Sequence, residues 1–82
     1  MNKQEILEIV VQHVYEVLPF LAGKDIKEDE SLINLGANSI DRTEICILTL
    51  ESLDLEIPLV ELSGIASIKM LVDRIYSKLH HV

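Results

Sequence analysis

The sequence has few aromatic residues and few residues that crosslink or interrupt a chain. Its 82 residues include two tyrosines, one phenylalanine, no tryptophan, three glycines, two prolines and a single cysteine, Cys46. One cysteine excludes an intrachain disulfide and fits a reducing compartment. Hydrophobic residues make up 49% of the chain, so an aliphatic core can form. The length predicts one domain, residues 1–82, near the lower limit for a fold without crosslinks.

Long hydrophobic runs and positive charge are also scarce. No segment approaches the roughly 18 consecutive apolar residues of a transmembrane helix. The first five residues lack the basic segment followed by a long apolar stretch that marks a signal peptide. We therefore expect a soluble, cytoplasmic protein. Fourteen acidic against seven basic residues give a net charge of -7, which argues against nucleic acid or anionic membranes as partners and favours proteins with basic patches.

Metal-ligand clusters are missing from the sequence. His13 is distant in sequence from His80 and His81, and Cys46 has no thiol or imidazole at ligand spacing, so no metal site is expected. We interpret His80 and His81 as a frayed terminus and Cys46 as a small packing residue.

The spacing of apolar residues predicts an all-α protein. Residues 3–18 repeat apolar side chains at intervals of three and four, as a helix with one buried face does. A second helix is predicted over 39–53, a short helical turn over 59–62, and a last helix after Ser67 as N-cap. The polar connection of residues 24–34 is long for a small bundle. The expected fold is a four-helix bundle with three main helices, one short helix and a long first loop.

Residues 35–41 (LGANSID) place a serine where a loop becomes a helix. Gly36 allows a sharp turn, Asn38 is a strong N-cap, and Asp41 lies in the first turn, where a carboxylate is favoured. Ser39 is therefore expected at the first helical position, with its hydroxyl exposed beside unpaired backbone N–H groups. An anion esterified to that hydroxyl would lie in a favourable field, so the position suits a phosphodiester.

Two other interpretations of Ser39 stay open, an ordinary helix start in an unmodified interaction subunit and the nucleophile of a small hydrolase. A nucleophile needs a base within hydrogen-bond reach and an oxyanion hole. His13 is the one histidine outside the terminal pair, and it lies in the middle of another predicted helix. We therefore expect no catalytic residues. The spacing of Asp41, Glu44 and Glu51 predicts one acidic face, either simply solvated or a strip that steers basic partners toward Ser39.

Over essentially its whole length the chain resembles an acyl carrier protein. Residues 35–40 (LGANSI) are similar to the family's phosphopantetheine attachment motif, Leu-Gly-x-Asp-Ser-Leu, and Ile57-Pro58 falls where carriers commonly have Ile-Pro after the second helix. The resemblance implies that a phosphopantetheinyl transferase attaches 4′-phosphopantetheine from coenzyme A to Ser39. The thiol of that arm, not Cys46, would carry the acyl group as a thioester, on a monomeric carrier.

Residues 36–42 (GANSIDR) and 57–64 (IPLVELSG) resemble a narrower group, the free-standing donor carriers of polyketide β-branching in antibiotic biosynthesis. In that group an acyltransferase supplies malonyl, and a decarboxylating ketosynthase-like enzyme converts it to acetyl. A hydroxymethylglutaryl-synthase-like enzyme then adds the acetyl to the β-keto group of a growing polyketide. The alternative is a general fatty-acid, polyketide or peptidyl carrier.

Departures from the fatty-acid carrier pattern suggest which residues select partners. Asn38 replaces the usual aspartate, Arg42 adds positive charge to the first turn, and Leu59 and Val60 stand where fatty-acid carriers are acidic. Arg42 is expected to pair with an acidic residue of the synthase. Ile47 and Leu59 either fill apolar pockets on a partner, or Ile47 is simply core and Leu59 covers the core's end. The full set of expected recognition residues is Asn38, Ile40, Asp41, Arg42, Thr43, Glu44, Ile47, Leu59 and Val60.

Overall fold

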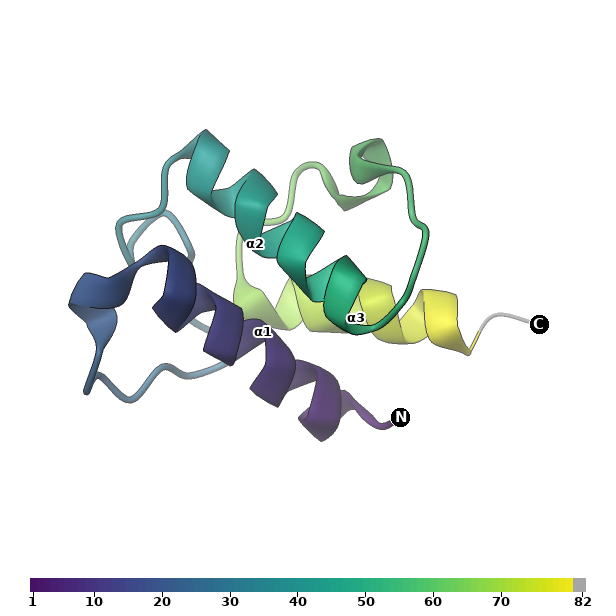
Figure 1. Cartoon of the computed structure of the whole chain (residues 1–82), viewed down its shortest axis with the longest axis horizontal. Helices are drawn as coiled ribbons and strands as arrows, with labels where there is room; N and C mark the ends of the chain where they lie inside the picture. Colours follow the sequence, from purple (N-terminus) through teal and green to yellow (C-terminus); the bar gives the residue numbers. More distant parts are fainter. Residues whose placement is uncertain (81–82) are drawn as a thin grey trace.

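The computed structural model describes residues 1–80 and shows three α-helices joined by loops (Figure 1). Helix α1 spans Lys3–Val17, α2 spans Ser39–Ser52 and α3 spans Ile68–Leu79, with 3₁₀ turns η1 at Pro19–Leu21 and η2 at Leu59–Leu62. The all-α prediction with three main helices is confirmed. His81 lies outside the described residues.

The predicted fourth helix is present only as a turn. η2 holds four residues in 3₁₀ geometry. Pro58 directly precedes it, and Gly64, in the left-handed region at φ 75°, lies two residues beyond it. These flanking residues leave too little chain for a regular α-helix, since proline donates no backbone hydrogen bond and a left-handed glycine ends helical geometry. The bundle is therefore three α-helices with a short 3₁₀ turn beside them.

Helix α1 packs against both α2 and α3, and η2 lies against α2. The core is aliphatic, as the composition predicts. Its fully buried side chains include Ile6, Val10, Val14, Ile45, Ile68, Leu71 and Ile75. Thr49 is the buried polar residue of the described chain, and its hydroxyl donates to the carbonyl of Ile45 at 2.7 Å, so burial leaves it hydrogen-bonded.

The long loop before α2 is fixed to the start of α3. Ser31 and Ser67 form an isolated antiparallel bridge. The N–H of Leu32 donates to the carbonyl of Ala66 at 3.2 Å, and the N–H of Lys69 donates to the carbonyl of Glu28 at 2.7 Å. Because these bonds and the buried Leu32 hold the loop, the chain reaches the start of α2 along a defined path.

Helix α2 ends in a Schellman motif one residue earlier than predicted. The N–H of Asp54 donates to the carbonyl of Glu51 at 3.1 Å, and the N–H of Leu55 donates to that of Leu50 at 2.9 Å. Asp54 is the non-glycine residue in the left-handed region, at φ 53°. This position normally takes glycine, because a Cβ is unfavourable there.

Replacing Asp54 with glycine is expected to raise the free energy of unfolding by roughly 0.5 kcal/mol, since relief of the left-handed strain exceeds the entropic cost of glycine. Thermal or urea unfolding measures the change. Asp54→Ala is the matched control, because it removes the carboxylate and keeps the Cβ. Equal stabilisation by alanine would show that the backbone angle is not the cause.

A search of the helices within residues 1–80 finds none that combines the length and the apolar character required to cross a bilayer.

Candidate functional site

A capping box forms the start of α2. The side-chain oxygen of Asn38 accepts the N–H of Asp41 at 2.8 Å, and a carboxylate oxygen of Asp41 accepts the N–H of Asn38 at 3.2 Å. The prediction that Asn38 is the N-cap is confirmed. Two of the four N–H groups without intrahelical partners are thereby satisfied. The remaining two, on Ser39 and Ile40, face the open end of the helix.

Ser39 is the first residue of α2 and is exposed. One turn later the hydroxyl of Thr43 donates to the backbone carbonyl of Ser39 at 2.9 Å, within the helix. The Ser39 side chain therefore stands at the positive end of a helix, next to two free N–H donors. This arrangement stabilises an anion attached to the serine oxygen.

Gly36 makes the turn into α2 possible. Its φ is 104°, a conformation that side chains disfavour, and a Cβ built there would lie 3.0 Å from the ring carbon Cζ of Phe20. Next to it, Ala37 is buried and its N–H donates to the carbonyl of Leu32 at 3.0 Å. The turn is therefore packed on both sides, and it fixes the position from which Ser39 projects.

A pocket of about 240 Å³ opens beside Ser39, between α2 and η2. The residues that line it are Leu32, Ser39, Arg42, Thr43, Cys46, Leu59, Leu62, Ser63, Gly64 and Ile65. Cys46 is 8% exposed, and burial raises the pKa of its thiol. A protonated, buried thiol is a poor nucleophile, in agreement with its interpretation as a packing residue.

Four exposed apolar side chains lie on α2 and η2, where Ile40 and Ile47 line one shallow pocket and Ile47 and Leu59 line another. Ile40 is 75% exposed, Ile47 39%, Leu59 42% and Val60 74%. We call these four residues the docking surface. Ile47 and Leu59 are thus surface residues and do not belong to the buried core, although Leu59 lines the pocket beside Ser39 together with the buried Leu32 and Leu62. Exposed apolar residues grouped in this way are typical of a protein interaction site.

The charged residues predicted for recognition divide into two kinds. Glu44 and Glu51 are exposed on α2. Asp41 is half-buried and its carboxylate belongs to the capping box. Arg42 is also half-buried, and its Nη1 donates to the carbonyl of Ala37 at 3.1 Å. Asp41 and Arg42 therefore stabilise the start of α2, in addition to any contact they make with a partner.

His13 is far from the start of α2. Its Nδ1 lies 2.9 Å from a carboxylate oxygen of Glu16, and its Nε2 lies 2.6 Å from the hydroxyl of Ser52. Ser52 is the last residue of α2, so the imidazole joins α1 to the end opposite Ser39. Among the described residues no histidine therefore lies beside Ser39 as the hydrolase interpretation would require. Within residues 1–80 no group of three or more His, Cys, Asp or Glu side chains can hold a metal.

Residues 8–75 match the family model described as the phosphopantetheine attachment site. The chain belongs to this family, whose members are acyl carrier domains. It is a carrier, not a catalyst, and its prosthetic group is covalently attached 4′-phosphopantetheine.

Two relatives of similar length are themselves acyl carrier proteins. The chain is 44% identical over 78 residues to a polyketide biosynthesis acyl carrier protein, AcpK, of Bacillus subtilis (strain 168), covering 95% of each chain. It is 38% identical over 69 residues to an acyl carrier protein of Prochlorococcus marinus (strain MIT 9515), covering 83% of this chain and 85% of the relative.

One solved structure has the same fold, a crystal structure of the HMG synthase of the curacin biosynthetic pathway in complex with its acetyl donor carrier protein. The TM-score is 0.87 at 35% identity, with 92% of this chain and 96% of that chain covered.

The residues at the start of α2 fit the prosthetic group. A phosphodiester needs an accessible hydroxyl, and the exposed Ser39 supplies one. A diester on that oxygen would be an anion, and the free N–H groups of Ser39 and Ile40 would stabilise it. The nearest first-turn carboxylate, that of Asp41, is bonded back to Asn38, so part of its charge is already compensated. The pocket of about 240 Å³ borders the same serine.

Sequence reasoning did not identify the residues that hold η2. Arg74 and Lys78 lie four residues apart on α3 and both contact η2 or the residue after it. Their spacing is visible in the sequence, but two of the groups they bind are backbone carbonyls, which no side-chain pattern reveals.

Proposed function

We propose that this protein carries 4′-phosphopantetheine on Ser39 and donates an acetyl group to a hydroxymethylglutaryl-synthase-like enzyme during polyketide β-branching. The observation that carries the proposal is the likeness, at TM-score 0.87 and 35% identity, to the acetyl donor carrier of the curacin pathway. The exposed hydroxyl of Ser39 at the start of α2 supports the attachment point.

Each residue at the start of α2 has a separate task in this proposal. Ser39 supplies the ester oxygen, and the N–H groups of Ser39 and Ile40 stabilise the anionic diester. The capping box of Asn38 and Asp41 keeps the helix end rigid, so the arm always leaves from the same point. When bound, the arm supplies a thiol that holds the acyl group as a thioester.

The docking surface brings the loaded carrier to its partner. Its four apolar side chains supply the contact, and the exposed Glu44 and Glu51 attract an enzyme with a basic rim. Once docked, the tethered acetyl group is present at high effective concentration. A small contact of this kind also dissociates quickly, as a shuttle requires.

Further partners follow from the same proposal. A phosphopantetheinyl transferase attaches the arm, an acyltransferase supplies malonyl, and a decarboxylating ketosynthase-like enzyme forms the acetyl group. The protein acts as a monomer. Because Cys46 is a free thiol, we assign these reactions to the reducing cytoplasm.

The test is transfer of acetyl from this protein to the HMG synthase of the curacin pathway, followed by the intact mass of the synthase. We expect acetylation at least tenfold faster than from the Prochlorococcus acyl carrier protein loaded in the same way. Equal rates from the two carriers would favour the second candidate, a general fatty-acid, polyketide or peptidyl carrier.

A further inference from the structure

η2 is held to the rest of the molecule mainly by side chains. Among residues 1–80 the backbone hydrogen bonds of this turn and its flanks are local, from Glu61 to Pro58 at 2.9 Å and from Ser63 to Val60 at 3.2 Å. Leu62 is 4% exposed and anchors the turn in the core. Ile57 before the turn is also buried and Ile65 after it packs against the core, so apolar contacts hold both flanks, while within the turn itself Leu62 is the buried side chain. Further contacts are needed to orient Leu59 and Val60.

Arg74 of α3 supplies such contacts. Its Nη1 donates to the backbone carbonyl of Glu61 at 2.8 Å and to that of Ser63 at 3.0 Å. These carbonyls lie at the C-terminal end of η2, where a helix attracts positive charge. Two bonds from one nitrogen to residues on either side of Leu62 restrain rotation about that anchor.

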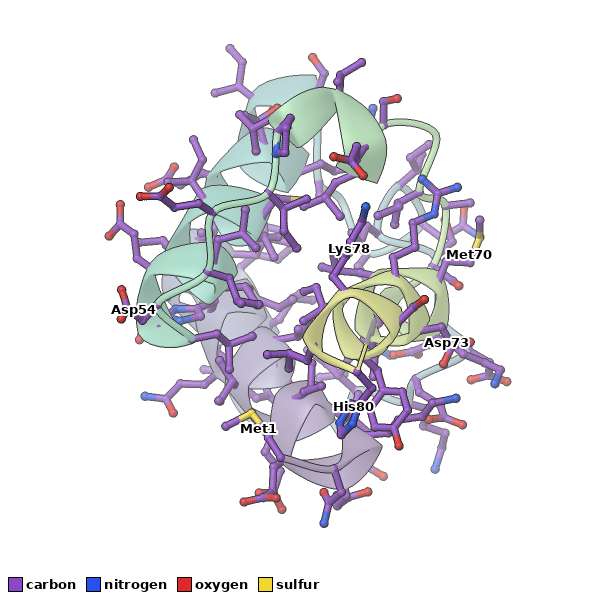
Figure 2. All side chains as sticks on the ribbon, turned by 90° about the vertical axis from the view of Figure 1, so that its right-hand side faces the viewer. Met1, Asp54, Met70, Asp73, Lys78 and His80 are labelled. Carbon is purple, nitrogen blue, oxygen red and sulfur yellow. The ribbon has the colours of Figure 1, made fainter. Side chains whose placement is uncertain are left out.

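Lys78 adds an ion pair on the same face of α3. Its ammonium contacts the carboxylate of Glu61, and in Figure 2 the Lys78 side chain extends from α3 toward η2. Asp73 points away from η2 in the same view, and it pairs with Lys3 at 3.1 Å and Lys69 at 3.7 Å. Arg74 and Lys78 therefore form the face of α3 that contacts η2, whereas Asp73 and Lys69 pair with each other and Asp73 with Lys3.

We propose that Arg74 is a positioning residue for partner recognition. It lies outside the docking surface, and it fixes η2 so that Leu59 and Val60 are presented to the synthase together with Ile47 of α2. Partner choice is thereby set in part by α3. This inference rests on the proposed function.

The experiment measures acetyl transfer to the curacin HMG synthase from the Arg74→Gln variant. We expect the KM for the carrier to rise about fivefold with kcat changed less than about twofold, since two hydrogen bonds orient the surface and take no part in chemistry. Arg74→Lys keeps the charge but not the double contact, so an intermediate rise of about twofold is expected. Lys69→Gln, which removes one positive charge from α3 away from η2, is the matched control with unchanged KM.

A second measurement separates positioning from a general loss of structure. In a Val60→Ser background, Arg74→Gln should add less than about twofold to KM, because both changes act through the same contact. A full further fivefold loss would overturn the inference, and so would a wild-type KM for Arg74→Gln.

Hydrogen exchange distinguishes failure of this inference from failure of the proposed function. Arg74→Gln should speed amide exchange in residues 59–65 with little change in α1. Unchanged exchange there overturns the inference whether or not the synthase accepts acetyl. Lack of transfer from the wild type instead counts against the acetyl-donor role itself.

Discussion

Replacing Ser39 with alanine is expected to abolish loading by a phosphopantetheinyl transferase while leaving the fold intact. The proposed attachment at the exposed start of α2 requires the Ser39 hydroxyl. Thr43, one turn away, uses its hydroxyl to donate to the carbonyl of Ser39. Ser39 itself is exposed, and capping is performed by Asn38, so the free energy of unfolding should change by less than about 0.5 kcal/mol. Intact mass after incubation with coenzyme A and a transferase, together with thermal unfolding, measures both quantities.

Asn38→Ala is the contrasting control, because it weakens the helix start and keeps the hydroxyl. Loss of the acceptor for the N–H of Asp41 should cost about 1 kcal/mol of stability. Loading should become slower and remain measurable. A mass increase of one arm on Ser39→Ala would show that another side chain is the attachment point.

Features governed by neighbouring residues were predictable from the sequence. Asn38 and Ser67 are N-caps as predicted, because capping depends on a polar side chain within the first turn. The core-facing side of α3, predicted as Ile68, Leu71, Val72, Ile75 and Leu79, was also predictable: the first four are buried, and Leu79 is half-buried against the core. Their spacing places the apolar side chains on one face of the helix, so only one rotation of α3 about its axis turns them all toward the core.

The pattern on α2 was ambiguous because apolar residues occur on more than one side of it. Ile45 and Ile47 are alike in sequence terms, yet the first is 0% and the second 39% exposed. Only the positions of α1 and η2 decide between them. The contacts of Arg42 and Arg74 were hidden for a related reason, since both arginines bind backbone carbonyls. Tertiary structure brings those carbonyls within reach of the arginines, and the residue types alone do not predict these hydrogen bonds.

Replacing Arg42 with glutamate is expected to slow acetyl transfer to the synthase by tenfold or more, about 1.4 kcal/mol. Arg42 lines the pocket beside Ser39, and one of its N–H groups donates to the carbonyl of Ala37 at 3.1 Å. A guanidinium has five such donors, so the others can pair with a carboxylate on the partner. Steady-state transfer at several salt concentrations measures the effect, and the difference from wild type should shrink as salt increases.

Because Arg42 also donates to the carbonyl of Ala37, slower transfer could instead result from a disturbed turn before α2. Two observations separate this structural effect from the loss of a contact with the partner. Arg42→Gln keeps an N–H donor for the Ala37 carbonyl and loses only the charge, so about threefold slower transfer is expected from it. Glutamate in the first turn of α2 is also favoured by the helix dipole, where arginine is not, and this offsets part of the lost bond. Thermal unfolding and loading at Ser39 should therefore change little while acetyl transfer drops. Parallel losses in stability, loading and transfer would instead assign Arg42 to the turn that positions Ser39.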